Sequence, residues 1–256
     1  MIFIIGGNGF VGSAFVRYCE RHGLEHRVIT RENYEQFAGA SCTLLVNANG
    51  NSSKLLSNRE PLRDFDASVR TVRASLADIT TDVYVLLSSC DVYPDCSTPE
   101  TTREDRVVNP ADQSGYGFHK ALAERCVQHA AKNWLIFRLG GMVGPRLRKN
   151  AIYDILQGGP LWLAPESELQ FMATDDVAGT VFRIADSGTR NDTFNLCGNG
   201  TVRLSTVMGW VDGSVEVKPD APAVRYNVSI EKISKLTPIP RTDEAIRRFV
   251  EQARGA

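Results

Sequence analysis

Tyr116 and Lys120 are the residues of this chain whose types and spacing best suit acid–base chemistry. On a helix, residues four positions apart lie on one face, so the phenol and the ammonium would be neighbours. Delivery of a hydride to a carbonyl needs a proton donor at the oxygen, and the reverse reaction needs a base. A free tyrosine has a pKa of about 10, and the charges of Lys120 and of an oxidised nicotinamide would favour the phenolate. The alternative is a buried tyrosine beside a snorkelling lysine.

Ser89 is the third residue expected at this site. It follows the apolar run Val83–Leu87, which is typical of a buried strand. Ligands bind at the carboxyl ends of the strands in open α/β sheets. The Ser89 hydroxyl would hold the same substrate oxygen as Tyr116. Asp91 is a further candidate for substrate contact, although a turn-capping aspartate is the more common role.

Three glycines, Gly6, Gly9 and Gly12, stand three positions apart directly after the apolar run Ile2–Ile5. Glycines at this place permit a tight turn, close approach of a pyrophosphate and close packing of the following helix on the strand. The helix N-terminus then offers free N–H groups to the phosphates. The pattern predicts a dinucleotide-binding loop that also includes Asn8, Phe10 and Val11; an ordinary glycine-rich turn is the alternative.

The end of the next strand, Arg27–Thr30, bears on which dinucleotide is bound. A carboxylate there would bind the ribose 2′-hydroxyl of NAD, but no acid stands at the expected place. Thr30 and Arg31 suit a 2′-phosphate better, through a charge-assisted contact. We therefore predict NADP as the cofactor. Glu32 nearby leaves NAD open, and Arg31 as a plain surface arginine is the alternative.

These candidate residues need a scaffold in which short buried strands alternate with helices. Apolar runs predict strands at Ile2–Ile5, Arg27–Thr30, Thr43–Val46, Val83–Leu87, Trp134–Leu139 and Thr193–Cys197. Helical periodicity predicts helices at Val11–His22, Arg63–Ile79, Tyr116–Ala131, Asn150–Gln157, Asp175–Asp186 and Thr242–Arg254, and we expect a loop over Gly140–Pro145. This alternation predicts a doubly wound parallel α/β sheet of the Rossmann type. We expect residues 1–145 and 171–197 to form that core, and residues 146–170 and 198–256 to form a small substrate-binding lobe.

The composition excludes several classes of function. Lys plus Arg (29) nearly balance Asp plus Glu (30), which argues against nucleic acid as a partner. The six cysteines are scattered and the four histidines form no cluster, so we expect reduced thiols, a cytoplasmic protein and no metal site. No apolar run approaches the ~20 residues of a membrane span, and no basic segment precedes the first strand, so neither a membrane anchor nor a signal peptide is expected.

Several motifs together resemble the extended short-chain dehydrogenases/reductases, the group of sugar-nucleotide epimerases, dehydratases and keto-sugar reductases. Gly6–Gly12 is similar to the family's GxxGxxG, and Tyr116–Lys120 matches its YxxxK. Further similar segments are Asn47–Gly50, Ser88–Tyr93, Arg138–Pro145 and Phe171–Val177. The resemblance implies that Ala48, Asn49, Gly50, Tyr116, Lys120 and Leu139 contact the cofactor. It also implies that Gly141 and Arg146 join Ser89, Asp91 and Tyr116 at the substrate, a nucleotide-linked sugar, and that a homodimer can form.

Four departures from the family pattern narrow the expected reaction. Gly141 replaces the asparagine of RxxNxxGP, Ser68 replaces a helix asparagine, and Leu169 replaces a basic residue that often contacts the nucleotide diphosphate. Cys90 stands where the dehydratases carry an aspartate, which argues against 4,6-dehydration. Ketone reduction or C4 epimerisation remains. Two alternatives stay open: a protein that senses NAD(P) without catalysis, and a reductase of a non-sugar ketone or aldehyde.

Overall fold

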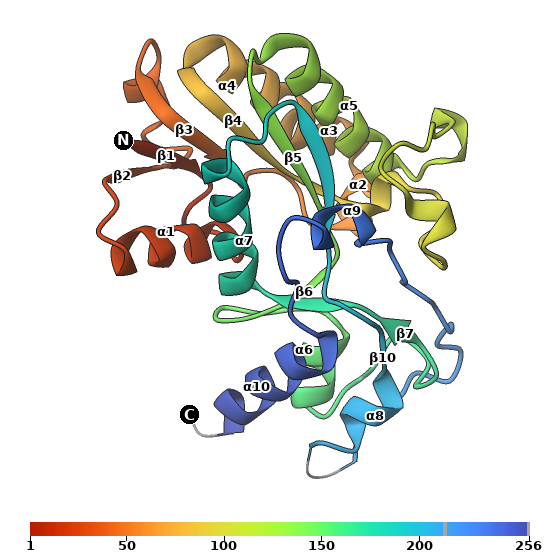
Figure 1. Ribbon diagram of the computed structural model, residues 1–256. Coiled ribbons are helices and arrows are strands. Elements are labelled where there is room, and N and C mark those ends of the chain that lie inside the picture. The colour runs from red at the N-terminus through yellow and green to blue at the C-terminus, as the bar shows by residue number, and fades with distance from the viewer. Residues whose placement is uncertain (212–213, 255–256) are drawn as a thin grey trace.

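The computed structural model describes residues 1–211 and 214–254; residues 212–213 and 255–256 of the predicted lobe lie outside the described residues. A six-stranded parallel sheet forms the centre, in the order β2-β1-β3-β4-β5-β9 (Figure 1). Its strands are β1 (Ile2–Ile5), β2 (His26–Ile29), β3 (Ser41–Asn47), β4 (Thr80–Ser89), β5 (Trp134–Leu139) and β9 (Asp192–Leu196). The predicted doubly wound α/β fold is confirmed.

Helices cover both faces of this sheet because each buried strand presents apolar side chains to both sides. In β1, Ile4 packs in the cluster with α1 and α7, whereas Phe3 and Ile5 pack in the cluster with α4 and α5. The bounds of these helices are Gly12–Arg21 for α1, Thr71–Asp78 for α4, Gly115–Ala130 for α5 and Thr174–Asp186 for α7. Figure 1 shows α1 and α7 on one side of the sheet and α4 and α5 on the other.

The order of the strands in the sheet determines where the candidate site lies. The chain runs from β1 outward to β2 and then returns to β3 on the other side of β1. Such a reversal opens a crevice at the carboxyl ends of the strands, where dinucleotides bind in this fold class. The glycine loop after β1 and Ser89 at the end of β4 both lie at that edge of the sheet.

The segment predicted as the helix Arg63–Ile79 has a more complex structure. It divides into α3 (Pro61–Phe65), a π-helical turn η2 (Asp66–Arg70) and α4, and the short helix α2 (Lys54–Arg59) precedes it. Apolar periodicity does not distinguish an α-helix from a π-turn. π-Helical turns are often found at functional sites.

A second group of buried apolar side chains lies below the sheet in Figure 1, around β6, α6 and α10. Its elements are β6 (Gly141–Val143), α6 (Ala151–Leu156), β7 (Glu168–Leu169), β8 (Phe171–Ala173), β10 (Val202–Arg203), α8 (Leu204–Met208) and α10 (Thr242–Arg254). The short helix α9 (Glu231–Ser234) packs on β9 instead, and its Ile233 lies in the cluster with α1 and α7. The expectation of a loop over Gly140–Pro145 was wrong, because pairing with β8 makes β6 a strand. The division into core and lobe stays a prediction. No described helix is long and apolar enough to cross a membrane.

Candidate active site

The glycine loop is a compact turn in which Gly6 and Gly12 cannot be replaced by a residue with a side chain. Gly6 has φ +77°, and the Gly9 N–H donates to its carbonyl oxygen at 2.9 Å. A Cβ on Gly12 would lie 2.1 Å from that same oxygen, so only glycine lets α1 begin this close to β1. The first turn of α1 carries no acidic residue and receives no hydrogen bond from a capping side chain. Its N–H groups can therefore receive an anionic diphosphate.

The turn after β2 is organised by Asn33, which is not among the residues singled out from the sequence. Its Oδ1 accepts the Thr30 backbone N–H at 2.7 Å, and its Nδ2 donates to the Val28 carbonyl at 3.1 Å. Arg31 and Glu32 are both exposed on this turn. A hydrogen bond from Thr30 lowers the pKa of Glu32. A cation and a carboxylate thus stand together where the adenosine ribose is expected.

Helix α5 brings Tyr116 and Lys120 onto one buried face. Ser114 begins the helix, and its Oγ accepts the Gly117 N–H at 3.1 Å. Each of the two side chains is only 8% exposed, and the Lys120 Nζ lies 5.6 Å from the centre of the Tyr116 ring. Gly117 is essential for this placement, since a Cβ there would lie 2.0 Å from the Asp91 carbonyl oxygen. The close contact seats α5 against the segment that follows Ser89.

The Ser89 hydroxyl lies near the Tyr116 phenol, and its own hydrogen bond in this structure is donated to Asp91 Oδ2 at 3.3 Å. Burial, together with the charge of Asp91, raises the pKa of Tyr116 well above its usual value, and the nearby Ser89 hydroxyl only partly opposes this. The protein alone therefore holds Tyr116 as a phenol, which is the form that donates a proton.

Lys120 is a buried cation whose pKa is lowered to about 8 by desolvation, against the opposing charges of Asp64, Glu124 and Asp91. Its Nζ lies beside Gly50, where a Cβ would approach within 3.0 Å of the nitrogen. Gly50 has φ +129°. The predicted cofactor segment Ala48–Gly50 therefore borders Lys120, and its last residue must be small to leave room for the ammonium.

A buried hydrogen-bonded pair that no sequence pattern indicated lies next to Lys120. The His119 Nδ1 and the Asp64 Oδ2 are 2.7 Å apart, and Asp64 is fully buried. Asp64 Oδ1 accepts from Asn51 Nδ2 at 2.9 Å and from Ser68 Oγ at 3.1 Å. Burial alone would raise the pKa of Asp64, but its hydrogen bonds outweigh this effect and lower the pKa. Ser68, on the turn η2, thus belongs to a polar network that orders the loop beside Gly50.

Asp91 forms an ion pair and a hydrogen bond with two residues from distant parts of the chain. Lys54 Nζ lies 2.7 Å from Asp91 Oδ1, and the Tyr226 hydroxyl donates to the same oxygen at 2.9 Å. Lys54 also donates to the Tyr226 oxygen at 2.9 Å. No motif marks Lys54 or Tyr226 in the sequence, because only the fold brings α2 and the segment before α9 to this point.

The remaining candidates lie at the rims of the site. Leu139 ends β5 beside Ser89 in the sheet register. A Cβ on Gly141 would lie 2.6 Å from the Gln170 carbonyl oxygen, so an asparagine does not fit at this position without movement of the backbone. The Arg146 Nη1 donates to the Asn8 carbonyl at 3.2 Å, which places Arg146 at the glycine loop rather than beside Ser89. Its predicted contact with substrate stays a prediction.

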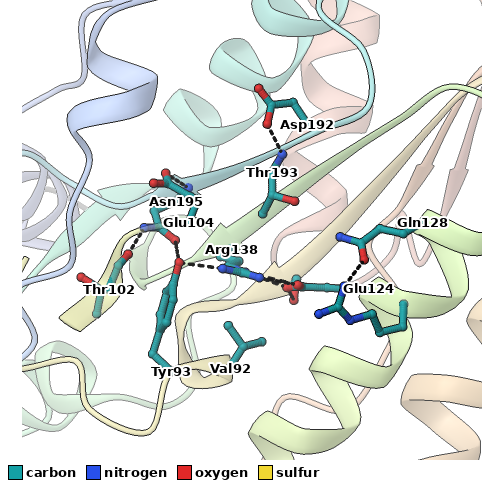
Figure 2. A network of polar contacts seen from close by, with 12 residues as sticks. Val92, Tyr93, Thr102, Glu104, Glu124, Gln128, Arg138, Asp192, Thr193 and Asn195 are labelled. Atoms are coloured by element: carbon teal, nitrogen blue, oxygen red, sulfur yellow. Dashed lines mark hydrogen bonds and ion pairs between the residues drawn. The ribbon is translucent and has the colours of Figure 1, made fainter. Parts of the chain in front are cut away.

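A second polar network holds α5 against the sheet (Figure 2). Glu124, one turn after Lys120, accepts from Arg138 Nη2 and from Ser88 Oγ, at 2.7 and 2.6 Å. Arg138 Nη1 donates to the Tyr93 hydroxyl at 2.7 Å. The bonds join α5 to β4 and β5, the strands that carry Ser89 and Leu139. The orientation of the α5 face that carries Tyr116 and Lys120 therefore depends on a buried salt bridge as well as on apolar packing.

Comparisons with known proteins agree with this geometry. The family model of the NAD dependent epimerase/dehydratase family matches residues 2–197. Among solved structures, a UDP-galactose 4-epimerase superposes with a TM-score of 0.78 at 22% identity, with 99% of this chain and 98% of that chain covered. MoeE5 in complex with UDP-glucose and NAD superposes with a TM-score of 0.82 at 15% identity. The UDP-N-acetylglucosamine 4-epimerase from Methanobrevibacter ruminantium superposes with a TM-score of 0.79 at 16% identity. Each of these two superpositions covers 99% of this chain and 98% of the other chain. No curated protein sequence matches the chain.

Proposed function

Because the chain belongs to the NAD dependent epimerase/dehydratase family, we propose that it transfers a hydride at a hydroxyl-bearing or keto carbon of a nucleotide-linked sugar, as an epimerase or a keto-sugar reductase. The observation that carries this proposal is the buried phenol of Tyr116, which shares a helix face with Lys120 and lies near the Ser89 hydroxyl. The solved structures with the same fold include a complex of UDP-glucose with NAD, which supports the substrate class.

The residues present fit a nicotinamide dinucleotide. The uncapped first turn of α1 would receive the diphosphate, and Lys120, whose ammonium lies beside Gly50, would bind the nicotinamide ribose. When bound, the dinucleotide supplies the site that donates or accepts the hydride. Thr30 and Arg31 would contact a ribose 2′-phosphate, so we propose a preference for NADP. NAD is the alternative, and it is the dinucleotide bound in the structurally similar complexes.

The protein's own residues would then transfer the proton to or from the substrate oxygen. In the reducing direction Tyr116 protonates the substrate oxygen, and Ser89 donates to that oxygen and orients it. In the oxidising direction Tyr116 must act as a base, although burial raises its pKa. The positive charge of Lys120 then favours the phenolate. A lysine whose own pKa is near 8 is well placed to exchange that proton with solvent.

Dehydration is not part of this proposal. A dehydratase must protonate a leaving hydroxyl, and Cys90, which stands at the position of that acid, is buried with its Sγ donating to the Arg138 carbonyl at 3.2 Å. Burial raises the pKa of the Cys90 thiol well above its usual value. The thiol faces the protein interior and lacks a carboxyl group. The homodimer expected from the resemblance stays a prediction.

The test is turnover of UDP-sugars and UDP-4-keto-sugars with NAD(H) and NADP(H), followed by NMR and by absorbance at 340 nm. A C4 epimer formed without a net change in absorbance identifies an epimerase, and stoichiometric loss of reduced cofactor identifies a reductase. Tyr116→Phe should lower kcat about 10²–10⁴-fold, the usual worth of a general acid–base. Turnover that persists unchanged in Tyr116→Phe would refute the role of the phenol. Dinucleotide binding without turnover of any sugar would instead indicate the sensing function.

A further inference from the structure

Lys54, Asp91 and Tyr226 form a polar cluster that adjoins the proposed catalytic serine. Asp91 Oδ1 holds both Lys54 Nζ and the Tyr226 hydroxyl, and Asp91 Oδ2 accepts from Ser89 Oγ at 3.3 Å. Because Ser89 is the group proposed to hold the reacting oxygen, this bond places the cluster one hydrogen bond from it. A ring substituent next to the reacting carbon would meet it.

The cluster is open enough to receive a ligand. The side chain of Lys54 is 54% exposed and that of Asp91 is 19% exposed. Lys54 has three N–H donors, of which Asp91 and Tyr226 use two. One donor of Lys54 and the remaining lone pairs of Asp91 and Tyr226 are therefore left for further hydrogen bonds. This mixture of donors and acceptors suits hydroxyl groups, which both donate and accept.

The charges of the cluster cancel. Lys54 is paired with Asp91, and the titratable groups outside the cluster whose charges interact with Asp91 are Tyr116, Lys120, Cys90 and Cys96. A ligand carboxylate could accept the free donor of Lys54, but Asp91 already neutralises that charge, and the carboxylate would lie beside the Asp91 charge. Repulsion between the Asp91 carboxylate and a ligand carboxylate would therefore oppose binding of an acidic sugar.

We propose that Lys54, Asp91 and Tyr226 form a charge-balanced subsite that selects a sugar ring bearing hydroxyl groups over one bearing a carboxylate. The inference rests on the proposed function, because it assumes that a nucleotide-linked sugar places its ring beside Ser89. It identifies Asp91 as the residue that determines specificity, since its charge neutralises Lys54.

The test compares the binding of UDP-glucose and UDP-glucuronic acid to the full chain saturated with dinucleotide, by titration calorimetry. The wild-type protein should bind UDP-glucose at least about tenfold more tightly. In Asp91→Asn, Lys54 loses its partner, so binding of UDP-glucuronic acid should strengthen by about tenfold or more while that of UDP-glucose changes less than about threefold. In Lys54→Met, which leaves the Asp91 charge uncompensated, binding of UDP-glucuronic acid should weaken further.

The double variant Asp91→Asn/Lys54→Met is the matched control, and it should lose the gain for UDP-glucuronic acid. Unchanged affinity for the dinucleotide shows that each variant is folded. An unchanged ratio of the two sugar affinities in both single variants would overturn this inference while the proposed function stands. If the wild-type protein binds the dinucleotide but neither UDP-sugar, the proposed function fails and this inference falls with it.

Discussion

Removal of the Asp64 carboxylate is the perturbation that most directly tests the network behind Lys120. In Asp64→Ala, three buried donors on His119, Asn51 and Ser68 would lose their acceptor. Each unsatisfied buried donor costs about 1–3 kcal/mol. Because the three donors share one carboxylate, these costs are not fully additive, and we expect a decrease of about 3–5 kcal/mol in the free energy of unfolding. That is a large share of the roughly 5–15 kcal/mol available to a protein.

Urea denaturation followed by circular dichroism measures this decrease, provided that the slope of the transition is unchanged. Asp66→Asn is a matched control, because Asp66 lies in the next turn of the same helical segment but forms only an exposed pair with Arg70. That pair should contribute less than about 0.5 kcal/mol. A loss below about 1 kcal/mol in Asp64→Ala, or equal losses in the two variants, would refute the importance of the buried network.

Two further predictions concern the cofactor and the dependence of stability on pH. Replacement of the exposed Arg31 by alanine should weaken NADP binding by about tenfold to a hundredfold, with little effect on NAD; equal losses for both dinucleotides in fluorescence titrations would contradict the 2′-phosphate contact. The pKa of Lys120 falls from 10.5 to about 8 on folding, so between these values the unfolded chain binds more protons and stability rises with pH. Relative to Lys120→Met, the wild-type protein should therefore gain up to about 3 kcal/mol between pH 8 and 10.5, and parallel pH–stability curves for the two proteins would contradict the depressed pKa.

The fold could be predicted in detail because its signals are local. The run Ile2–Ile5, the glycine spacing of Gly6–Gly12 and the helix that follows depend on nearest neighbours along the chain, and each formed within a residue or two of its expected place. The strands β6 and β8 were harder to predict. Each is three residues long, and they exist only because they pair with each other across a long intervening segment.

The proposed catalytic residues are also visible in the sequence, but their surroundings are not. The four-residue spacing of Tyr116 and Lys120 is enough to place both side chains on one face of a helix. His119 lies between them in the sequence, and only the structure shows that its ring meets Asp64 in a buried pair. Asn33 had a weak signal, since asparagine commonly organises turns. Lys54 and Tyr226 had none.

The amino-acid sequence by itself determined the parallel α/β scaffold, the glycine loop and the Ser89, Tyr116 and Lys120 triplet, because hydrophobic periodicity and short-range spacing specify them. Only the tertiary structure decided what adjoins that triplet: Asp64 and His119 behind Lys120, and Lys54 with Tyr226 on Asp91. These contacts join residues as far as 172 positions apart. Their existence depends on how helices and loops pack on the sheet, and no local pattern records that packing.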